Sequence, residues 1–265
     1  MKTLVIVQAR TGSTRLPGKV LMQVAGKTLL EHQLRRIRTA STPLELVIAT
    51  TRQAEDDPIE ELCRRLDVKC FRGHSNDLLD RHFEAARMYK AETVVKIPSD
   101  CPLIDPAVID HVLSHYHLHS TDYDYCSNLH PATYPDGNDV EVIPFTVLEL
   151  AWQESILPFE REHTTPYIWD QPDLFRITNV AWPTGLDYSM SHRWTLDYPE
   201  DFRFIEAIYN ELWSETKIFT LEDILELLTR KPELAEMNQR YAGVNWYRLH
   251  TAELRTITSN QTRII

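Results

Sequence analysis

The order of apolar and polar residues predicts an α/β protein. Four short, almost continuous apolar runs alternate with segments whose apolar residues recur every three or four positions. Continuous runs are typical of buried parallel strands, and the longer spacing is typical of amphipathic helices. The predicted strands cover residues 4–7, 44–49, 68–71 and 93–97. Their alternation with helices predicts a mostly parallel central sheet with right-handed crossovers and helices on both faces.

Residues at the expected helix starts support this alternation. Thr28 is a suitable N-cap, and the glutamate three positions later completes a capping-box pattern. Asp57-Pro58 and Asp105-Pro106 place a proline in the first turn of two further helices, where its missing N–H is tolerated. Each signal falls after a predicted strand, as crossover helices require.

The second half of the chain has a less regular pattern. Strands are expected over residues 139–143, 175–181 and 193–196. Helices are expected over residues 199–213 and 221–228. No internal repeat, low-complexity segment or linker interrupts this half.

The length suits one large domain with a small addition. A chain of 265 residues can bury a sizeable core. We expect an α/β domain over residues 1–215 and a C-terminal helical extension over residues 216–265. The extension is expected either to pack on the domain or to take part in an oligomer contact.

Charge and cysteine content narrow the class of protein. The net charge of −11 argues against a surface that coats nucleic acid. No apolar run approaches about 18 residues, so no insertion into a membrane is expected. The four cysteines form no Cys-x-x-Cys pair and are interpreted as reduced thiols of a cytoplasmic protein.

The loop after the first strand is the strongest candidate for a site. It contains three cations, Arg10, Arg15 and Lys19, at the carboxyl end of a predicted parallel strand, where ligands bind in open α/β sheets. The chain has seven glycines, against roughly 19 at average usage. Three of the seven lie before position 27, and glycines let backbone N–H groups approach an anion. The loop therefore predicts a polyphosphate site, although its spacing matches neither the P-loop nor the dinucleotide pattern.

Two aspartates follow predicted strands. Asp100 comes after the strand at 93–97, and Asp197 comes after the expected strand at 193–196. Two carboxylates facing a polyphosphate loop suit Mg²⁺, which takes few protein oxygens together with phosphates and water. A turn or cap role for Asp100, and capping of the helix at 199–213 by Asp197, are the open alternatives.

The histidines do not form a convincing metal motif. Four of them follow one another on or after one helix, and we interpret them as a solvated helix surface: His111, His115, His117 and His119. His163 is more informative because it lies among charged residues and hydroxyls before a proline. No Ser-His-Asp arrangement can be recognised in the sequence.

Several motifs together resemble the cytidylyltransferase family. The first is Ala9-Arg10-x-x-Ser13-x-Arg15-Leu16-Pro17-Gly18-Lys19-x-Leu21, followed by Gly26-Lys27. The others are Arg72-Gly73 with Asp77-x-x-Asp80-Arg81, Asp100-Cys101-Pro102-Leu103-Ile104-Asp105, Gly137-x-Asp139-Val140-Glu141, Glu162-His163-x-Thr165-Pro166-Tyr167 and Arg193-Trp194-Thr195-Leu196-Asp197-x-Pro199-Glu200-Asp201. The family includes the 3-deoxy-manno-octulosonate and acylneuraminate enzymes, and the likeness is greatest to the branch of spore coat polysaccharide biosynthesis protein F. One departure is Ser99, where the family usually has glycine.

The resemblance implies a Rossmann-like nucleotide-diphospho-sugar transferase fold and a nucleotidyltransferase domain over residues 1–215. It implies transfer of CMP from CTP to a sugar or sugar-acid acceptor for surface polysaccharide biosynthesis, with Mg²⁺ as cofactor and a homodimer as one compatible assembly. The implied catalytic residues are Arg10, Lys19, Asp100 and Asp197, and the implied metal ligands are Asp100 and Asp197. The implied nucleotide-binding residues are Ala9, Arg10, Thr11, Gly12, Ser13, Arg15, Lys19, Arg72, Gly73, Asp77, Asp80, Arg81, Ser99 and Asp100. The implied acceptor-binding residues are Glu141, Arg161, His163 and Arg193.

Two alternative functions remain open. One is a nucleotidyltransferase of the same fold that uses another nucleoside triphosphate and a sugar 1-phosphate. The other is a non-catalytic nucleotide-binding module, which loss of Lys19, Asp100 or Asp197 would favour. All three residues are present.

Overall fold

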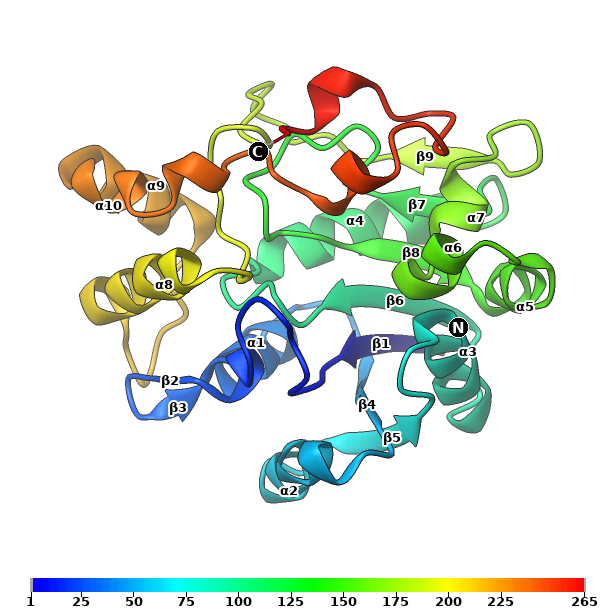
Figure 1. The fold of residues 1–265 in the computed structure, drawn as a ribbon, viewed down its shortest axis with the longest axis horizontal. Helices are drawn as coiled ribbons and strands as arrows, with labels where there is room; N and C mark the ends of the chain where they lie inside the picture. The colour runs from blue at the N-terminus through cyan, green and yellow to red at the C-terminus, as the bar shows by residue number, and fades with distance from the viewer. Residues whose placement is uncertain (1, 265) are drawn as a thin grey trace.

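A seven-stranded sheet forms the centre of the computed structural model, which describes residues 2–264 (Figure 1). Its strand order is β5-β4-β1-β6-β8-β7-β9. The strands are β1 (Thr3–Gln8), β4 (Glu45–Thr51), β5 (Lys69–Gly73), β6 (Thr93–Pro98), β7 (Tyr125–Ser127), β8 (Glu141–Pro144) and β9 (Ile177–Asn179). Only β8 among them runs against the others. A separate hairpin pairs β2 (Gln23–Val24) with β3 (Lys27–Thr28).

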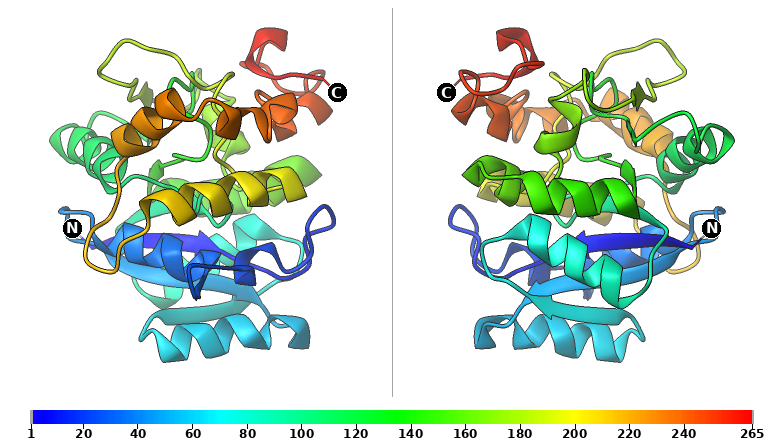
Figure 2. Two further views of the ribbon diagram at one scale, coloured as in Figure 1. Left: turned by 90° about the vertical axis from the view of Figure 1, so that its left-hand side faces the viewer. Right: turned by 90° about the vertical axis from the view of Figure 1, so that its right-hand side faces the viewer.

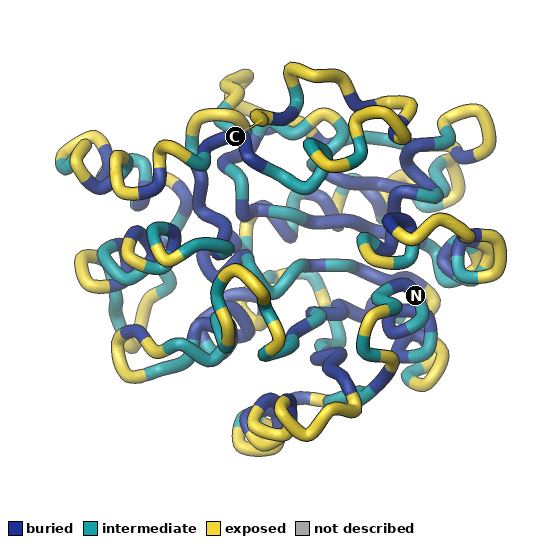
Figure 3. The backbone as a smooth tube through the Cα atoms, viewed as in Figure 1, coloured by how far each residue is buried: buried dark blue, intermediate teal, exposed yellow. Residues whose placement is uncertain are grey.

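Helices cover both faces of the sheet, as the two side views of Figure 2 show. They are α1 (Leu29–Arg38), α2 (Asp57–Arg65), α3 (Leu78–Met88), α4 (Pro106–Leu118), α5 (Phe145–Glu154), α6 (Pro158–His163), α7 (Pro166–Trp169), α8 (Pro199–Leu212), α9 (Leu221–Arg230) and α10 (Glu233–Glu236). Alternate residues of each strand point to opposite faces. Val5 and Val7 of β1 pack with α1, α4 and α8, whereas Leu4 and Ile6 pack with α3, α5 and α7. The buried strands and the exposed outer sides of the helices are evident in Figure 3.

The predicted fold of the first half is confirmed. All four predicted strands are present and parallel, and each is followed by a helix. Thr28 caps α1 by accepting a hydrogen bond from the Glu31 N–H at 3.1 Å. Asp105 caps α4 through the Ala107 N–H at 2.7 Å. Local sequence signals were therefore sufficient to predict the first half, in which each strand is followed by a helix.

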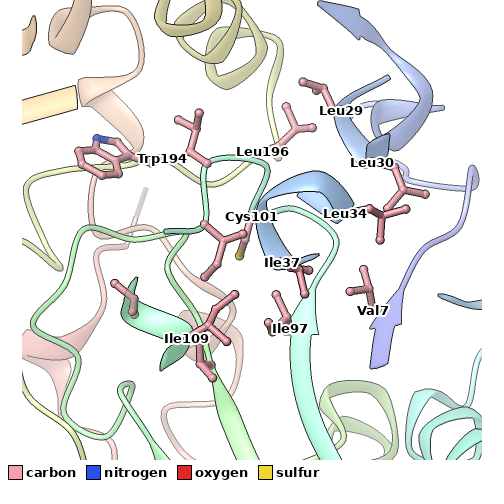
Figure 4. Close-up of a cluster of buried hydrophobic side chains, with 14 of the residues drawn as sticks. Val7, Leu29, Leu30, Leu34, Ile37, Ile97, Cys101, Ile109, Trp194 and Leu196 are labelled. Atoms are coloured by element: carbon pink, nitrogen blue, oxygen red, sulfur yellow. The ribbon is translucent and has the colours of Figure 1, made fainter. Parts of the chain in front are cut away.

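The expected strand at 193–196 is wrong. Residues 193–196 are an irregular connection with a single bridge, between Asp136 and Arg193. The side chains of Trp194 and Leu196 pack in the core, which accounts for the apolar pattern that predicted a strand (Figure 4). The expected strand at 175–181 is shorter than predicted, and β7 and the helices α5, α6 and α7 were not predicted.

The C-terminal extension packs on the α/β domain. Helices α9 and α10 contact α8. The chain after α10 then returns across the β7 and β8 side of the molecule toward α6 and α7 (Figure 1). Leu254 and Ile257 are buried in the same core as α5 and α7. Asp170, which follows α7, accepts hydrogen bonds from the N–H groups of Arg255 and Thr256 at 2.7–2.9 Å.

Candidate functional site

The candidate site lies at the edge of the sheet where β1 and β6 end and β8 begins. The loop that follows β1 holds Ala9, Thr11, Gly12 and Ser13. Asp56 anchors this loop by accepting hydrogen bonds from the Thr11 N–H and hydroxyl at 2.7 and 2.8 Å. The loop ends at Gly18, whose φ of 68° is a left-handed conformation that glycine adopts without strain. The backbone then turns into a short 3-10 helix that carries Lys19.

Lys19 lies between the two predicted metal aspartates. Its Nζ is 2.9 Å from Asp197 Oδ1 and 3.6 Å from Asp100 Oδ2. The Arg15 guanidinium is 2.7 Å from the same Asp197 oxygen. Burial opposes the charge of Lys19, but the two carboxylates raise its pKa above the ordinary lysine value. Burial also opposes ionisation of Asp197, whereas Lys19 and Arg15 hold the pKa of this carboxyl below its usual range.

Backbone contacts bring the two aspartates together across 97 positions of sequence. The Asp100 carbonyl accepts hydrogen bonds from the Leu196 N–H at 2.8 Å and from the Thr195 hydroxyl at 3.1 Å. The side chains of Trp194 and Leu196 pack in the same core as Cys101, next to Asp100 (Figure 4). Both carboxylates therefore lie at one edge of the sheet, although Asp197 follows an irregular segment and not the predicted strand.

The capping alternative for Asp197 does not hold. The helix α8 is capped by Asp201, whose carboxylate accepts hydrogen bonds from the N–H groups of Asp197 and Tyr198, each at 2.9 Å. The Asp197 carboxylate instead faces cations. The turn at Asp100 likewise leaves its carboxylate directed to Lys19, with the Cys101 thiol 3.7 Å away.

Arg10, Gly73 and Arg81 meet on the β5 side of the loop. The Ser75 carbonyl accepts hydrogen bonds from Arg10 at 3.2 Å and from Arg81 at 3.3 Å. Arg81 is buried, its Nε has no hydrogen-bond partner among residues 2–264, and desolvation lowers its pKa to about 10. A Cβ on Gly73 would lie 2.7 Å from the Phe71 ring and 3.0 Å from Arg81 Cγ, so glycine permits this close packing.

Three other residues predicted to bind the nucleotide have partners within the chain. Arg72 donates to the Thr51 and Gln53 carbonyls and pairs with Asp57 and Glu60 at 2.6 and 2.8 Å. Asp77 caps α3 and also accepts two hydrogen bonds from Arg161, at 2.6 and 2.8 Å. Asp80 accepts a hydrogen bond from the Trp152 indole at 3.0 Å. Ser99 follows β6 and directly precedes Asp100.

The predicted acceptor residues separate into two groups. Glu141 begins β8, is buried, pairs with Lys96 and accepts a hydrogen bond from the Tyr125 hydroxyl at 2.7 Å. Burial opposes its ionisation, yet Lys96 holds the pKa of Glu141 below its usual range. The His163 ring stacks on Trp246 at 3.7 Å between centroids, and burial lowers its pKa to about 3. His163 is therefore neutral near pH 7.

The two predicted acceptor arginines are held by other protein groups. Arg161 bridges Asp77 and the Trp152 carbonyl. The side chain of Arg193 is 1% exposed and pairs with the fully buried Asp201 through two hydrogen bonds at 2.9 and 3.1 Å. A further Arg193 nitrogen donates to the Val244 carbonyl at 2.9 Å, and Asp197 lies 3.6 Å away. Both arginines thus organise the surroundings of the site.

Sequence reasoning did not single out several residues of this edge. Lys96, Tyr125, Asp139 and Tyr247 lie around Glu141. Desolvation raises the pKa of Asp139 to about 7, and the charges of Asp100 and Glu141 add to this effect. A lysine within an otherwise apolar strand was the signal for Lys96. No local pattern indicates Tyr247.

The two aspartates suit a hard divalent cation. Both carboxylates already contact one ammonium group, and carboxylate oxygens are the donors that Mg²⁺ prefers. Among residues 2–264, no three His, Cys, Asp or Glu side chains are arranged to hold a metal by themselves. A site with two carboxylates and substrate phosphates fits that observation. The histidines of α4 have ordinary partners, such as Tyr134 for His111 and Thr178 for His115.

An open cavity of about 400 Å³ lies elsewhere. Its lining includes Arg38, Thr42 and Asp67 and none of the residues of the candidate site. It is therefore separate from the sheet edge where Lys19 meets the two aspartates. None of the helices within residues 2–264 has the length and apolar character needed to cross a membrane.

A family model described as cytidylyltransferase matches residues 4–230. The chain belongs to the cytidylyltransferase family. Spore coat polysaccharide biosynthesis protein SpsF of Bacillus subtilis is 30% identical over 237 residues, which are 88% of this chain and 96% of that protein. The 3-deoxy-manno-octulosonate cytidylyltransferase of Solibacter usitatus is 38% identical over 111 residues, 41% of this chain and 42% of the relative.

A solved cytidylyltransferase from Leptospira borgpetersenii shares the fold. It is 31% identical, covers 89% of this chain and 97% of its own, and has a TM-score of 0.83. Together with the observed sheet, this similarity confirms the predicted Rossmann-like nucleotide-diphospho-sugar transferase fold. The branch named after the spore coat protein is also confirmed as related to this cytidylyltransferase.

Proposed function

We propose that this cytidylyltransferase transfers CMP from CTP to a hydroxyl of a sugar or sugar-acid acceptor and releases pyrophosphate. The observation that carries the proposal is the placement of Lys19 between Asp100 and Asp197, with Arg15 beside it. Cations and carboxylates at one sheet edge suit the binding of a triphosphate with Mg²⁺. The relatives named for polysaccharide biosynthesis and for 3-deoxy-manno-octulosonate support a product used in a surface polysaccharide.

The loop cations bind and orient the triphosphate in this proposal. Arg10, Arg15 and Lys19 approach the phosphates from the loop after β1. Two unit charges about 4 Å apart interact by roughly 4 kcal/mol at an effective dielectric constant near 20. The negative charge on the leaving pyrophosphate grows during the transfer, so contacts that strengthen with that charge increase kcat.

The two aspartates hold Mg²⁺ in this proposal. The bound cation would supply neutralisation of the phosphates and Lewis acidity. Lys19 changes partners when the nucleotide binds, from the carboxylates toward the phosphate oxygens. Arg193 and Asp201 stabilise the position of Asp197, because the Asp201 carboxylate accepts hydrogen bonds from both Arg193 and the Asp197 N–H.

The base and the acceptor occupy opposite sides of the loop in this proposal. Arg10 and Arg81, near Ser75, lie on the side assigned to base and ribose. Glu141 and His163 lie on the side assigned to the acceptor.

Since the four cysteines are free thiols, as expected in a reducing compartment, we also propose a cytoplasmic location.

A pyrophosphate-release screen tests this function. CTP, UTP, GTP and ATP are each combined with Mg²⁺ and a panel of sugar acids, phosphonates and sugar phosphates. We expect turnover with CTP at least about tenfold above that with the other nucleotides, a difference of about 1.4 kcal/mol. A preference for a purine, or equal use of all four nucleotides, would contradict the CTP assignment. Preference for another nucleotide with a sugar 1-phosphate would instead support the alternative transferase.

A further inference from the structure

A segment beyond the family-matched residues forms part of the acceptor side. The family model ends at residue 230, whereas the C-terminal segment, residues 238–257, returns to the sheet. Arg193 holds this segment through the Val244 carbonyl, and Asp170 holds it through the N–H groups of Arg255 and Thr256. The segment is thus tied near its start to Arg193, which lies beside Asp197, and near its end to the residue that follows α7.

Trp246 of this segment fixes the orientation of His163. The two rings are nearly parallel, with an interplanar angle of 11° and centroids 3.7 Å apart. Trp246 also lies next to His250, whose ring packs against Phe159 of α6. A flat, half-buried indole against an imidazole restricts rotation of the imidazole. His163 can therefore present one ring edge to the acceptor.

Tyr247 lies near Glu141, because its ring packs near His130, and His130 in turn lies 6.2 Å from the ring of Tyr125, whose hydroxyl donates to Glu141. Its ring packs near His130 and Trp169, at 6.2 and 5.8 Å between centroids. Within residues 2–264 its hydroxyl makes no hydrogen bond, and burial together with the charges of Glu141 and Asp139 raises the pKa of Tyr247 well above the ordinary tyrosine value. The phenol thus remains a protonated donor whose partner is not another protein group.

The cations around this side are already paired. Lys96 pairs with Glu141, Arg161 with Asp77, and Arg193 with Asp201. The remaining groups are a phenol, neutral imidazoles and aromatic faces. Such groups recognise hydroxyls and the apolar faces of a sugar better than they recognise a carboxylate or phosphate.

We propose that Tyr247 is a specificity-determining residue that donates its hydroxyl to a hydroxyl-bearing part of the acceptor, and that Trp246 is a positioning residue acting through His163. This inference deepens the proposed function and rests on it. It assigns a role in acceptor choice to residues that lie beyond the part of the chain matched by the family model.

Steady-state kinetics of Tyr247→Phe test the proposal. The assay uses CTP, Mg²⁺ and, from a panel of 3-deoxy-manno-octulosonate, N-acetylneuraminate and neutral hexoses, the acceptor that wild type uses fastest. We expect the KM for that acceptor to rise about five- to tenfold, as for one lost hydrogen bond, while the KM for CTP changes less than about twofold. Tyr89→Phe is the matched control, since its hydroxyl donates to the Cys70 carbonyl on β5.

Trp246 supplies an independent readout. Trp246→Ala is expected to raise the acceptor KM about tenfold, and Trp246→Phe, which keeps a stacking ring, is expected to recover most of that loss. An unchanged acceptor KM in Tyr247→Phe, or equal changes in the KM for acceptor and CTP, would overturn the inference while leaving the proposed function intact. No pyrophosphate release by wild type with any acceptor would overturn the proposed function and the inference together.

Discussion

The two halves of the sheet handle charge in opposite ways. The half built on β5, β4, β1 and β6, which we assign to the nucleotide and call the nucleotide half, takes Arg10, Arg15 and Lys19 from one loop, and Lys19 and Arg15 share Asp197. The half built on β8, β7, β9 and the C-terminal segment, which we assign to the acceptor and call the acceptor half, brings Glu141, His163 and Tyr247 together from distant parts of the chain, and Glu141 pairs with Lys96 of β6. Its cations are paired with carboxylates of the chain: Lys96 with Glu141, and Arg193 with Asp201, with Asp136 and Asp197 at 3.4 and 3.6 Å.

This difference indicates two kinds of recognition. A loop with several positive charges can bind along a polyanion, and its cations can exchange their carboxylate partners within the protein for phosphate groups. A set of paired charges and neutral rings offers little free charge and depends on shape and hydrogen bonding. If this comparison is right, the same kind of substitution should have different consequences in the two halves.

The largest expected effect is at the aspartates of the nucleotide half. Asp100→Asn and Asp197→Asn each keep the side-chain shape but remove a negative charge, so turnover should fall about 1000-fold, with an increased Mg²⁺ requirement. The double variant should lose far less than the product of the two, because both residues serve one site. A Mg²⁺ titration of turnover measures both effects.

The control for that experiment is Asp173→Asn, an exposed carboxylate between α7 and β9. It should match wild type. Thermal unfolding checks that each variant folds, since Asp197→Asn leaves Arg15 without its close partner. Near-normal turnover with an unchanged Mg²⁺ requirement in either single variant would remove that aspartate from the site.

A smaller effect is expected for the cation between the aspartates. Lys19→Ala removes a charge that strengthens its contact as pyrophosphate leaves, so kcat should fall about 100-fold and the KM for CTP should rise. Lys27→Ala, which removes a lysine paired with Glu31 at 3.3 Å, is the matched control and should keep wild-type kinetics. Wild-type kinetics in Lys19→Ala would contradict the assignment of this loop to phosphate.

The smallest expected effect concerns stability in the region between the halves. His82 is buried beside Gln8, and desolvation lowers its pKa to about 3. The unfolded chain binds a proton near pH 6.5 and the folded protein does not, so stability is full above that pH and falls as pH decreases toward 3. Between pH 7 and 5 this histidine should cost about 2 kcal/mol.

Denaturant unfolding at pH 7 and pH 5 measures this cost. His82→Gln should lose about 2 kcal/mol less stability between these pH values than wild type does. His119→Gln, at the exposed end of α4, should lose as much as wild type. Parallel losses in wild type and His82→Gln would show that the folded state does not suppress proton uptake by His82.

The difference between the two halves also explains which parts of the structure could be predicted from the sequence. The first four strands have continuous apolar runs, and their order in the chain leads directly to the parallel sheet. The loop after β1 contains its cations within ten positions, so the sequence alone was sufficient to predict it as a candidate phosphate site. Asp100 was predicted as a site residue because it lies two positions after a strand.

The acceptor half could not be predicted in this way. Residues 193–196 have the apolar pattern of a strand, but their backbone N–H groups bond to the Asp136 and Asp100 carbonyls, and only one isolated bridge, to Asp136, forms within the described part of the chain. Arg193 was expected to face the acceptor, and its burial against Asp201 depends on α8 and the C-terminal segment. Tyr247 reaches the surroundings of Glu141 only because the chain returns after α10, and no local pattern encodes such a return.

The reversed direction of β8 leaves room for change during evolution. Because β8 runs against β6, the loop that leads into it lies at the same edge where the parallel strands end. Gly137 belongs to that loop, at a φ of 107°, and a Cβ there would come within 2.8 Å of the Trp194 backbone. A side chain at this glycine would therefore be strained, whereas the stretch before it has an exposed position at Pro131. A lineage could lengthen that stretch, or exchange the C-terminal segment, to acquire a new acceptor while it inherits the loop after β1 unaltered.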